Sequence, residues 1–405
     1  MKKIAKLSLV AAVAVVGFTS ANAQSLEEAI KNVETSGSVV YRYNDYNNDV
    51  GTGSSDSTNY YKVALNLSSK VNDDVKFNSR FLASDADGGF AGMDTQAAGD
   101  QNVDLTLSNA YFGYTGIQNT TVNVGKQGLT TPWTVAVDSD GNEQTGTGIL
   151  AMSNVGPVTL AAAYFNQHNT DNSGNYATKV NTSGVTTFQL TDGSEDVATV
   201  GAIATLGPVT LDAWYINVQD TLDSYTIGAN SKFEVSDVKL GVDARYTGLS
   251  FDKNNLAGLS EDDDQSLGKI TLTAKAGIVD AKLAYAMTNK DGGIVALDTD
   301  AVTSIQGWSV NANGKADADY WQAVAGVDVL SNLNLSANYV NVDYSTSSTT
   351  DVEEEEIYAQ LVYKMSKNLS SYVRYGTYTK ETTSANVTSD VNDDVRGRVQ
   401  VEYTF

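Results

Sequence analysis

The sequence predicts an all-β protein, a transmembrane antiparallel up-and-down β-barrel of about 18 strands, with 16 strands as the alternative. Three observations point to it. Apolar and polar residues alternate with the strand period of two along the chain. Short turns alternate with longer connections, and tyrosines gather at the ends of the alternating segments, as in the aromatic girdles of such barrels.

The first 23 residues have the features of a secretory signal peptide, which would be removed from the mature chain. Lys2, Lys3 and Lys6 precede an apolar run over 7–18, and Ala21-Asn22-Ala23 is a small-x-small cleavage site. Such a run is shorter than the roughly 20 residues that a transmembrane helix needs. We therefore expect residues 24–405 to form a single exported domain.

A short helix is predicted over 25–34, before the first strand. Ser25 and Glu28 have the spacing of a capping box. Leu26, Ala29, Ile30 and Val33 fall on one helical face.

Alternation then continues to the end of the chain. In the last segment Val399, Val401, Tyr403 and Phe405 share one face, with polar residues between them. Most segments are close to the 9–11 residues that a tilted strand needs to cross the hydrocarbon layer. Strands are predicted at 37–46, 58–69, 74–84, 103–115, 119–127, 147–154, 157–166, 196–206, 208–218, 224–234, 237–247, 266–277, 279–289, 318–330, 332–344, 353–365, 368–380 and 394–405.

The connections predict a closed barrel with both termini on one side, built from eight short turns and nine long external loops. Closure is required because no water in the bilayer satisfies the backbone groups of an open edge. The lumen of so many strands is too wide for side chains to fill, and a polar lumen is a water-filled channel. The long loops are expected near 47–57, 85–102, 128–146, 167–195, 219–223, 248–265, 290–317, 345–352 and 381–393.

Composition excludes several other functions. The chain has 26 Lys and Arg against 49 Asp and Glu, a net charge of −23, no Cys and one His. Nucleic-acid binding needs a basic footprint, and thiolate metal sites need Cys. His168 is the only candidate base for a Ser-His pair, and no serine spacing selects a partner for it, so no enzyme is expected.

Basic residues on the polar faces of the early and late strands predict a positive patch on one wall of the pore. The first and last strands are neighbours in a closed barrel, so these side chains should lie near one another. Routine solvation of the lumen is the alternative interpretation. The patch comprises Arg42, Lys62, Lys76, Arg80, Arg374, Arg396 and Arg398.

The third long loop, 128–146, is predicted to fold inward and narrow the pore. Its acids Asp138, Asp140 and Glu143 would face the basic wall and create a transverse field. Asp138-x-Asp140-Gly141 also hints at calcium, but an Asp-Gly turn explains it better, because the glycine does not match an EF-hand loop. No cofactor is expected otherwise.

Further acids crowd the external loops and predict a negative mouth that attracts cations. Solvated loop charge is the simpler interpretation, and bridging by divalent ions to anionic lipid headgroups is another. These acids are Asp85, Asp87, Asp94, Asp100, the runs 261–264 and 353–356, Asp351, Asp390, Asp393 and Asp394.

Two stretches resemble the Campylobacter-type major outer membrane porin family, and the ending resembles the assembly signal common to outer-membrane barrels. The first is 25–33 running into Ser36-Gly37-Ser38-Val39-Val40-Tyr41-Arg42-Tyr43. The second joins Val124-Gly125-Lys126-Gln127 to Trp133-Thr134 and Gly146-Thr147-Gly148. The ending that resembles the assembly signal is Val399 to Phe405. The resemblance implies an eighteen-stranded trimeric porin whose third long loop forms the constriction.

We therefore expect a passive outer-membrane channel, weakly cation-selective, for ions and small hydrophilic solutes. Its expected partners are outer-membrane lipid, lipopolysaccharide and two further copies of the chain. One alternative is a surface adhesin or passenger without a pore. The other is a saccharide-type channel, which needs a file of aromatic side chains along the lumen; Trp214 and Trp321 are the residues whose side is undecided.

Overall fold

The computed structural model describes residues 33–405, apart from 52, 87, 94–103, 171–177, 181–186, 190 and 253–263. The predicted signal peptide and most of the predicted 25–34 helix lie outside the described residues. Within the described ranges, no helix is long and apolar enough to span a membrane.

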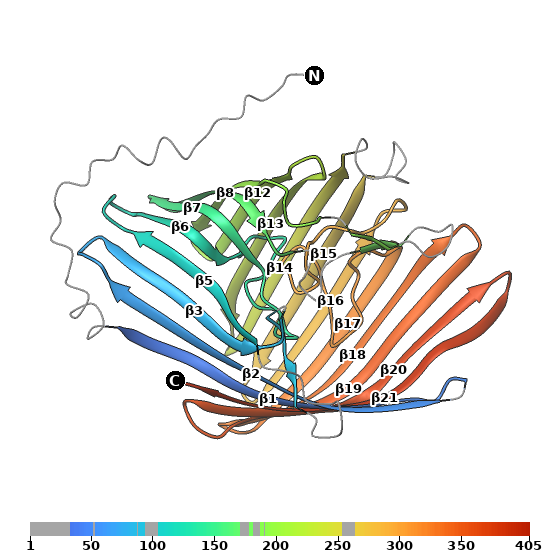
Figure 1. Ribbon diagram of the computed structural model, residues 1–405. Coiled ribbons are helices and arrows are strands. Elements are labelled where there is room, and N and C mark those ends of the chain that lie inside the picture. The colour runs from blue at the N-terminus through green and yellow to red at the C-terminus, as the bar shows by residue number, and fades with distance from the viewer. Residues whose placement is uncertain are drawn as a thin grey trace.

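Eighteen long strands of the described chain form one closed antiparallel sheet (Figure 1). Each pairs with the next, and the first pairs with the last, with Tyr41 opposite Val401. They are β1 (Glu34–Asn48), β2 (Ser54–Lys70), β3 (Val75–Ser84), β5 (Asp104–Tyr114), β6 (Thr120–Gly128), β7 (Thr145–Val155), β8 (Val158–His168), β11 (Val197–Leu206), β12 (Val209–Val218), β13 (Leu222–Val235), β14 (Val238–Phe251), β15 (Gln265–Ala276), β16 (Val279–Thr288), β17 (Ala316–Leu330), β18 (Leu333–Ser347), β19 (Thr350–Lys364), β20 (Leu369–Ser384) and β21 (Val387–Thr404).

Three shorter strands complete the set. β4 (Ala91–Gly92) pairs with β2, and β9 (Thr178–Val180) pairs with β10 (Thr187–Gln189) in a separate two-stranded sheet. The predicted barrel and its eighteen strands are confirmed. A passenger sheet with open edges is contradicted, because the pairing of β1 with β21 leaves no edge in the sheet.

Several strands run further than predicted at the end opposite the chain termini. The expected loops 345–352 and 381–393 are wrong: β18 and β19 are joined by residues 348–349, and β20 and β21 by Ala385 and Asn386, both at positive φ. A strand that rises above the membrane has water on both faces. It therefore keeps its pairing after its apolar alternation has stopped, and alternation alone places its end too early.

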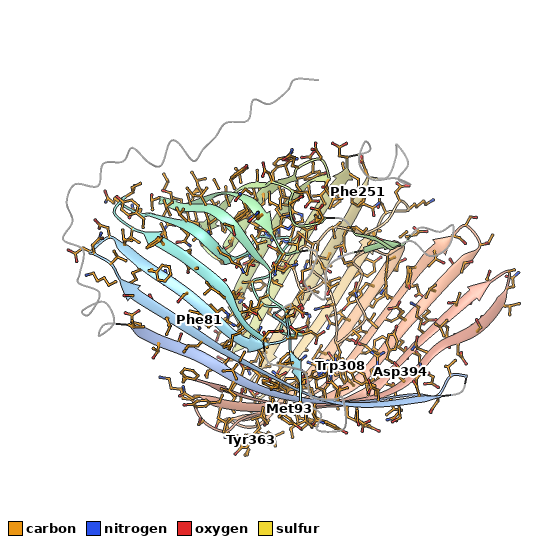
Figure 2. The ribbon with its side chains drawn as sticks, in the orientation of Figure 1. Phe81, Met93, Phe251, Trp308, Tyr363 and Asp394 are labelled. Carbon is orange, nitrogen blue, oxygen red and sulfur yellow. The ribbon has the colours of Figure 1, made fainter. Side chains whose placement is uncertain are left out.

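The outer surface of the barrel is apolar, as a bilayer requires. Phe81, Ile227 and Val373 are among its exposed side chains, and Figure 2 shows Tyr363 projecting from the outside. Trp321 also lies outside, where its ring packs against that of Tyr285 at 4.5 Å.

The predicted tyrosine girdle holds only in part. Tyr41, Tyr339 and Tyr375 face outward. Tyr46 instead hydrogen-bonds Arg398, and Tyr344 hydrogen-bonds the buried Glu354, so both lie in the lumen. These two side chains belong to the polar interior. The sequence alone does not distinguish lumen-facing tyrosines from those of the outer girdle.

Two loops, 129–144 and 289–315, enter the barrel and are joined to each other. The Leu297 amide donates to the Trp133 carbonyl at 2.8 Å, and the Thr303 amide to the Pro132 carbonyl at 3.0 Å. Trp133 is fully buried, and its Nε1 donates to Ser224 Oγ of β13 at 2.8 Å.

Apolar side chains fix these loops against the inner wall. One cluster joins the loops to β8 and to β11–β14, and a second joins loop 289–315 to β15–β18. The assignment of 290–317 to the exterior is therefore wrong; the run Ile294-Val295-Ala296-Leu297 is the signal that it packs inside.

Candidate functional site

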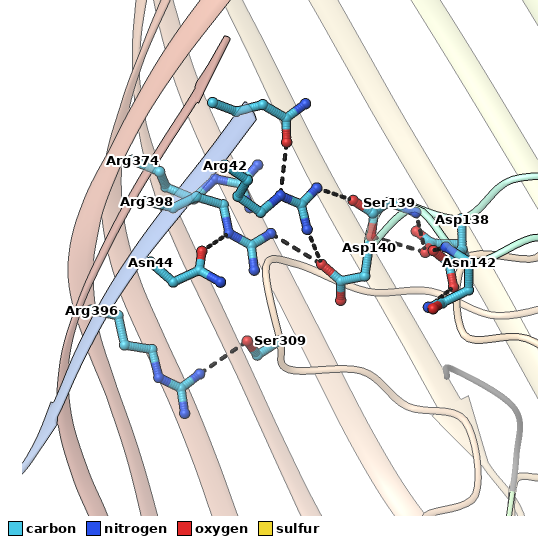
Figure 3. Close-up of polar contacts among 12 residues, drawn as sticks. Arg42, Asn44, Asp138, Ser139, Asp140, Asn142, Ser309, Arg374, Arg396 and Arg398 are labelled. Atoms are coloured by element: carbon cyan, nitrogen blue, oxygen red, sulfur yellow. Dashed lines mark hydrogen bonds and ion pairs between the residues drawn. The ribbon is translucent and has the colours of Figure 1, made fainter. Parts of the chain in front are cut away.

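The predicted cations on the first and last strands come together on one wall of the lumen. Strand register places Arg374 of β20 opposite Arg398 of β21, which is opposite Asn44 of β1. Arg42 lies in the adjacent lumen row, opposite Gln400. Figure 3 shows these side chains on the inner face of the sheet, directed toward the loop that carries Asp140.

Asp140 contacts this wall directly. Its Oδ1 accepts hydrogen bonds from Arg42 Nη1 at 2.9 Å and from Arg398 Nη1 at 3.1 Å. Arg42 Nη2 also donates to the Ser139 carbonyl at 2.7 Å. The acidic loop is therefore joined to the arginines by ion pairs, where the sequence predicted a gap with a field across it.

Glu143 makes a second, buried contact with the same wall. Lys62 Nζ lies 2.8 Å and Arg80 Nη2 2.7 Å from its Oε1, and Ser108 Oγ donates to its Oε2. Burial alone would raise the pKa of Glu143, but the hydrogen bonds and charges of Arg80 and Lys62 outweigh it and hold the pKa below its usual value.

Lys76 does not join this group. Its side chain is half-exposed, and its Nζ lies 3.4 Å from Glu34 Oε2 at the end of the barrel with the short turns. Between that end and Arg80 is a hollow of about 390 Å³, also lined by Ser36, Asn66 and Asn78. The charged wall therefore adjoins open space on its short-turn side.

The second loop meets the remaining arginines. Arg396 Nη1 donates to Ser309 Oγ at 2.9 Å, and its Nη2 pairs with Asp394. The ring of Trp308 lies 4.9 Å from the guanidinium carbon of Arg374 and 5.6 Å from that of Arg398. No pattern in the sequence pointed to Trp308.

Glu354 and Glu356 were assigned to an external acidic run, and that assignment is wrong. Both are buried on the lumen side of β19. Glu354 pairs with Lys315 at 2.9 Å and with Lys380 at 3.1 Å. The predicted strand 353–365 already contains both glutamates, and its alternation puts them on the same face as the buried Tyr358.

Three carboxylates of the two loops converge. Oxygens of Asp138, Asp298 and Asp300 lie within 4.8 Å of one another. Burial raises the pKa of Asp138 to about 6 and that of Asp298 to about 7, and neighbouring carboxylates add to both shifts. Asp298 Oδ2 is buried and has no hydrogen-bond partner among the described residues.

Asp138 also forms the turn that the sequence favoured over an EF-hand. Its carboxylate accepts from the Asn142 backbone and side chain at 2.8 Å, and Gly141 follows with φ of 85°. Asp140 is not part of the carboxylate trio. His168, the remaining titratable candidate, is buried, with Nδ1 2.9 Å from Thr170 Oγ1 and Nε2 3.6 Å from Glu195.

Several solved structures have a similar fold. OccK2 (OpdF) of Pseudomonas aeruginosa matches with a TM-score of 0.71 at 14% identity, over 92% of this chain and 98% of that one. OpdL of the same organism matches with a TM-score of 0.71 at 18% identity, over 92% of this chain and 99% of that one. OccAB3 of Acinetobacter baumannii matches with a TM-score of 0.70 at 14% identity, over 92% of this chain and 99% of that one. At these identities the likeness shows the fold alone. No curated protein sequence matches the chain.

The sequence profile of the Campylobacter major outer membrane protein matches residues 1–405, the whole chain. The closed barrel, its apolar exterior and its polar lumen agree with that match. The chain therefore belongs to the Campylobacter major outer membrane protein family and is a porin of the bacterial outer membrane.

Proposed function

We propose that the chain is a passive, weakly cation-selective diffusion channel that catalyses no reaction. The observation that carries this is the pairing of the lumen cations. Asp140 pairs with Arg42 and Arg398, and Glu143 pairs with Lys62 and Arg80, so the two carboxylates offset half of the charge of the four cations. Over the whole chain, 49 Asp and Glu against 26 Lys and Arg give a net charge of −23, which biases the pore toward cations. The two inward loops set the size limit.

Planar-bilayer recording tests this function. Purified chain should give discrete conductance steps, with a reversal potential of cation sign across a KCl gradient. Liposomes that carry the chain should become permeable to small sugars. A reversal potential of anion sign would contradict the selectivity, and vesicles that stay tight would contradict the pore.

A second candidate function is a channel for saccharide-type solutes. It requires aromatic side chains along the lumen, and Tyr46, Trp308, Tyr358 and Tyr372 surround the arginines there. A solved OccK2 structure, similar in fold, holds glucuronate. Uptake of glucuronate that saturates at millimolar concentration would favour this candidate, whereas linear uptake favours passive diffusion.

We further propose that Asp138, Asp298 and Asp300 hold a calcium ion at the junction of the two loops. Carboxylate oxygens are the ligands that Ca²⁺ prefers, and the unpartnered Oδ2 of Asp298 is available to it. In calorimetric titration with CaCl₂, Asp298→Asn should weaken binding by about tenfold or more. Asp343→Asn, on the outer surface, is the control, and equal binding by all three proteins would reject the site.

Assembly is proposed to follow the sequence expectation of a homotrimer embedded in lipid and lipopolysaccharide. The continuous apolar exterior supports both kinds of contact. Native mass spectrometry from detergent should give three times the chain mass, and a monomer at all detergent concentrations would reject the trimer.

A further inference from the structure

The tip of loop 289–315 is a tight turn seated on one buried carboxylate. Glu356 of β19, 2% exposed, accepts the backbone N–H groups of Trp308, Ser309 and Val310, the last two at 2.9 and 3.3 Å. The turn closes on itself, because the Gly307 amide donates to the Val310 carbonyl at 2.8 Å. Successive N–H groups directed at one anion form a nest, which fixes the turn in one position.

The fit around Glu356 is close. A Cβ atom on Gly307 would stand 2.0 Å from Glu356 Oε1 and 2.5 Å from Val340 Cγ2, nearer than side-chain atoms approach. The turn therefore needs glycine here in order to reach the carboxylate.

This seat determines where the Trp308 ring lies. The ring is 4.9 Å from the guanidinium carbon of Arg374 and 5.6 Å from that of Arg398, with Tyr358 packed edge-on at a centroid distance of 5.5 Å. Ser309, the next residue, accepts a hydrogen bond from Arg396. One short turn thus contacts three cations of the wall.

Aromatic rings surround Arg374: its guanidinium carbon is 4.9 Å from the Trp308 ring, 5.2 Å from that of Tyr358 and 5.3 Å from that of Tyr372. Arg398 is paired with Asp140, but no ion pair of Arg374 occurs in the described part of the chain, and its Nε donates to the neutral Gln360. Arg374 also stands directly opposite Arg398 in the sheet, where like charges repel. The negative face of an aromatic ring offsets part of that cost.

We propose that Trp308, positioned by Glu356, covers Arg374 and Arg398 and so sets the ion selectivity of the waist, the part of the pore that the two inward loops narrow. The cover shields these two cations from passing anions. Glu356 touches no solute in this account and acts only through the turn. The proposal rests on the proposed cation-selective function and names the residues that control it.

Two variants that leave the net charge unchanged test whether the Trp308 ring covers these cations. Trp308→Ala removes the ring, and Glu356→Asp keeps the charge but shortens the side chain by one methylene, away from the nest. In bilayer recordings across a KCl gradient, each should lower the ratio of potassium to chloride permeability by about threefold, of the order that one cation–π contact carries. The double variant should show no further fall, because both changes act on the same ring.

Control variants separate this role from general loosening of the barrel. Trp308→Phe keeps an aromatic face and should retain the wild-type ratio. Glu355→Asp, a neighbour in β19 on the opposite side of the strand, should also leave it unchanged. Heat-modifiable gel mobility shows that each barrel is folded before recording.

An unchanged permeability ratio in folded Trp308→Ala would overturn the cover. A lower permeability ratio in Trp308→Ala together with a wild-type ratio in Glu356→Asp would overturn the positioning role of Glu356. Failure of the proposed function has a different signature, because it appears in the wild-type chain as absent steps or an anion-sign potential.

Discussion

The inner wall of the barrel has two halves that hold the same loops in different ways. In the apolar half, β8 and β11–β18, buried side chains such as Ile216, Leu267 and Val340 pack against the loops. In the charged half, β19–β21 and β1–β3, the loops meet Arg and Lys through ion pairs.

The difference separates anchoring from selectivity. Each fully buried apolar side chain contributes about 1.5–3 kcal/mol, whereas a partly exposed pair such as Arg42–Asp140 contributes about 0–1 kcal/mol. The buried Lys62–Glu143 pair adds little net stability, because desolvation offsets its attraction, although removing one partner is costly. The apolar half therefore fixes the loops, and the charged half arranges the charges along the remaining path.

The largest effect is expected from removing the anchor. Trp133→Ala deletes a fully buried indole and should destabilise the seated loops by about 3–5 kcal/mol. Hydrogen-exchange mass spectrometry should show faster exchange in 129–144 and 297–303, and single-channel conductance should rise. Trp321→Ala, on the outer surface, is the matched control. Protection equal to wild type in Trp133→Ala would show that apolar packing does not hold the loops.

Glu143→Ala should have the next largest effect. It leaves Lys62, which is itself buried, without its counter-charge, at a cost of about 3 kcal/mol. Glu143→Gln keeps an oxygen acceptor for Arg80 and should cost less. Hydrogen exchange of loop 129–144 at increasing urea concentration measures both changes. Equal urea midpoints for wild type and Glu143→Ala would show that the pair does not stabilise the loop.

Asp140→Asn should change selectivity more than stability. Its carboxylate is 42% exposed, so the loss of stability should stay below about 1 kcal/mol. Arg42 and Arg398 would lose their counter-charge, and the preference for cations should fall roughly twofold through the local field. The reversal potential in a KCl gradient measures this, and a shift toward cations would contradict the assigned role.

The smallest effect is expected from the acids at the mouth. Raising KCl from about 0.1 to 1 M shortens the Debye length from roughly 10 to 3 Å. The contribution of exposed acids such as Asp351 and Asp393 should therefore fade, while the buried pairs remain. A permeability ratio that is independent of salt would place all selectivity at the waist.

The strands were predictable because one lipid-facing and one water-facing side impose strict alternation. The same physics limits the prediction. Above the membrane no side chain must be apolar, so the upper parts of β18–β21 looked like loops, and Glu354 and Glu356 looked external.

The waist was predictable only where it depends on strand register. Arg42 and Arg398 had to meet once β1 paired with β21. Trp308 and the Asp298–Asp300 carboxylates depend on the path of a long loop, which packing determines and periodicity does not. Lys76 shares the face of Arg80 but lies too far along β3 to reach Glu143.

The most direct test of the two-halves account is chemical access from the lumen, since the chain contains no cysteine of its own. Two variants are treated with a cationic methanethiosulfonate reagent during single-channel recording. They are Gln360→Cys in the charged half and Ala286→Cys beneath the loop in the apolar half. The account predicts a stepwise fall in conductance for Gln360→Cys and none for Ala286→Cys. Block at position 286 with none at position 360 would contradict it.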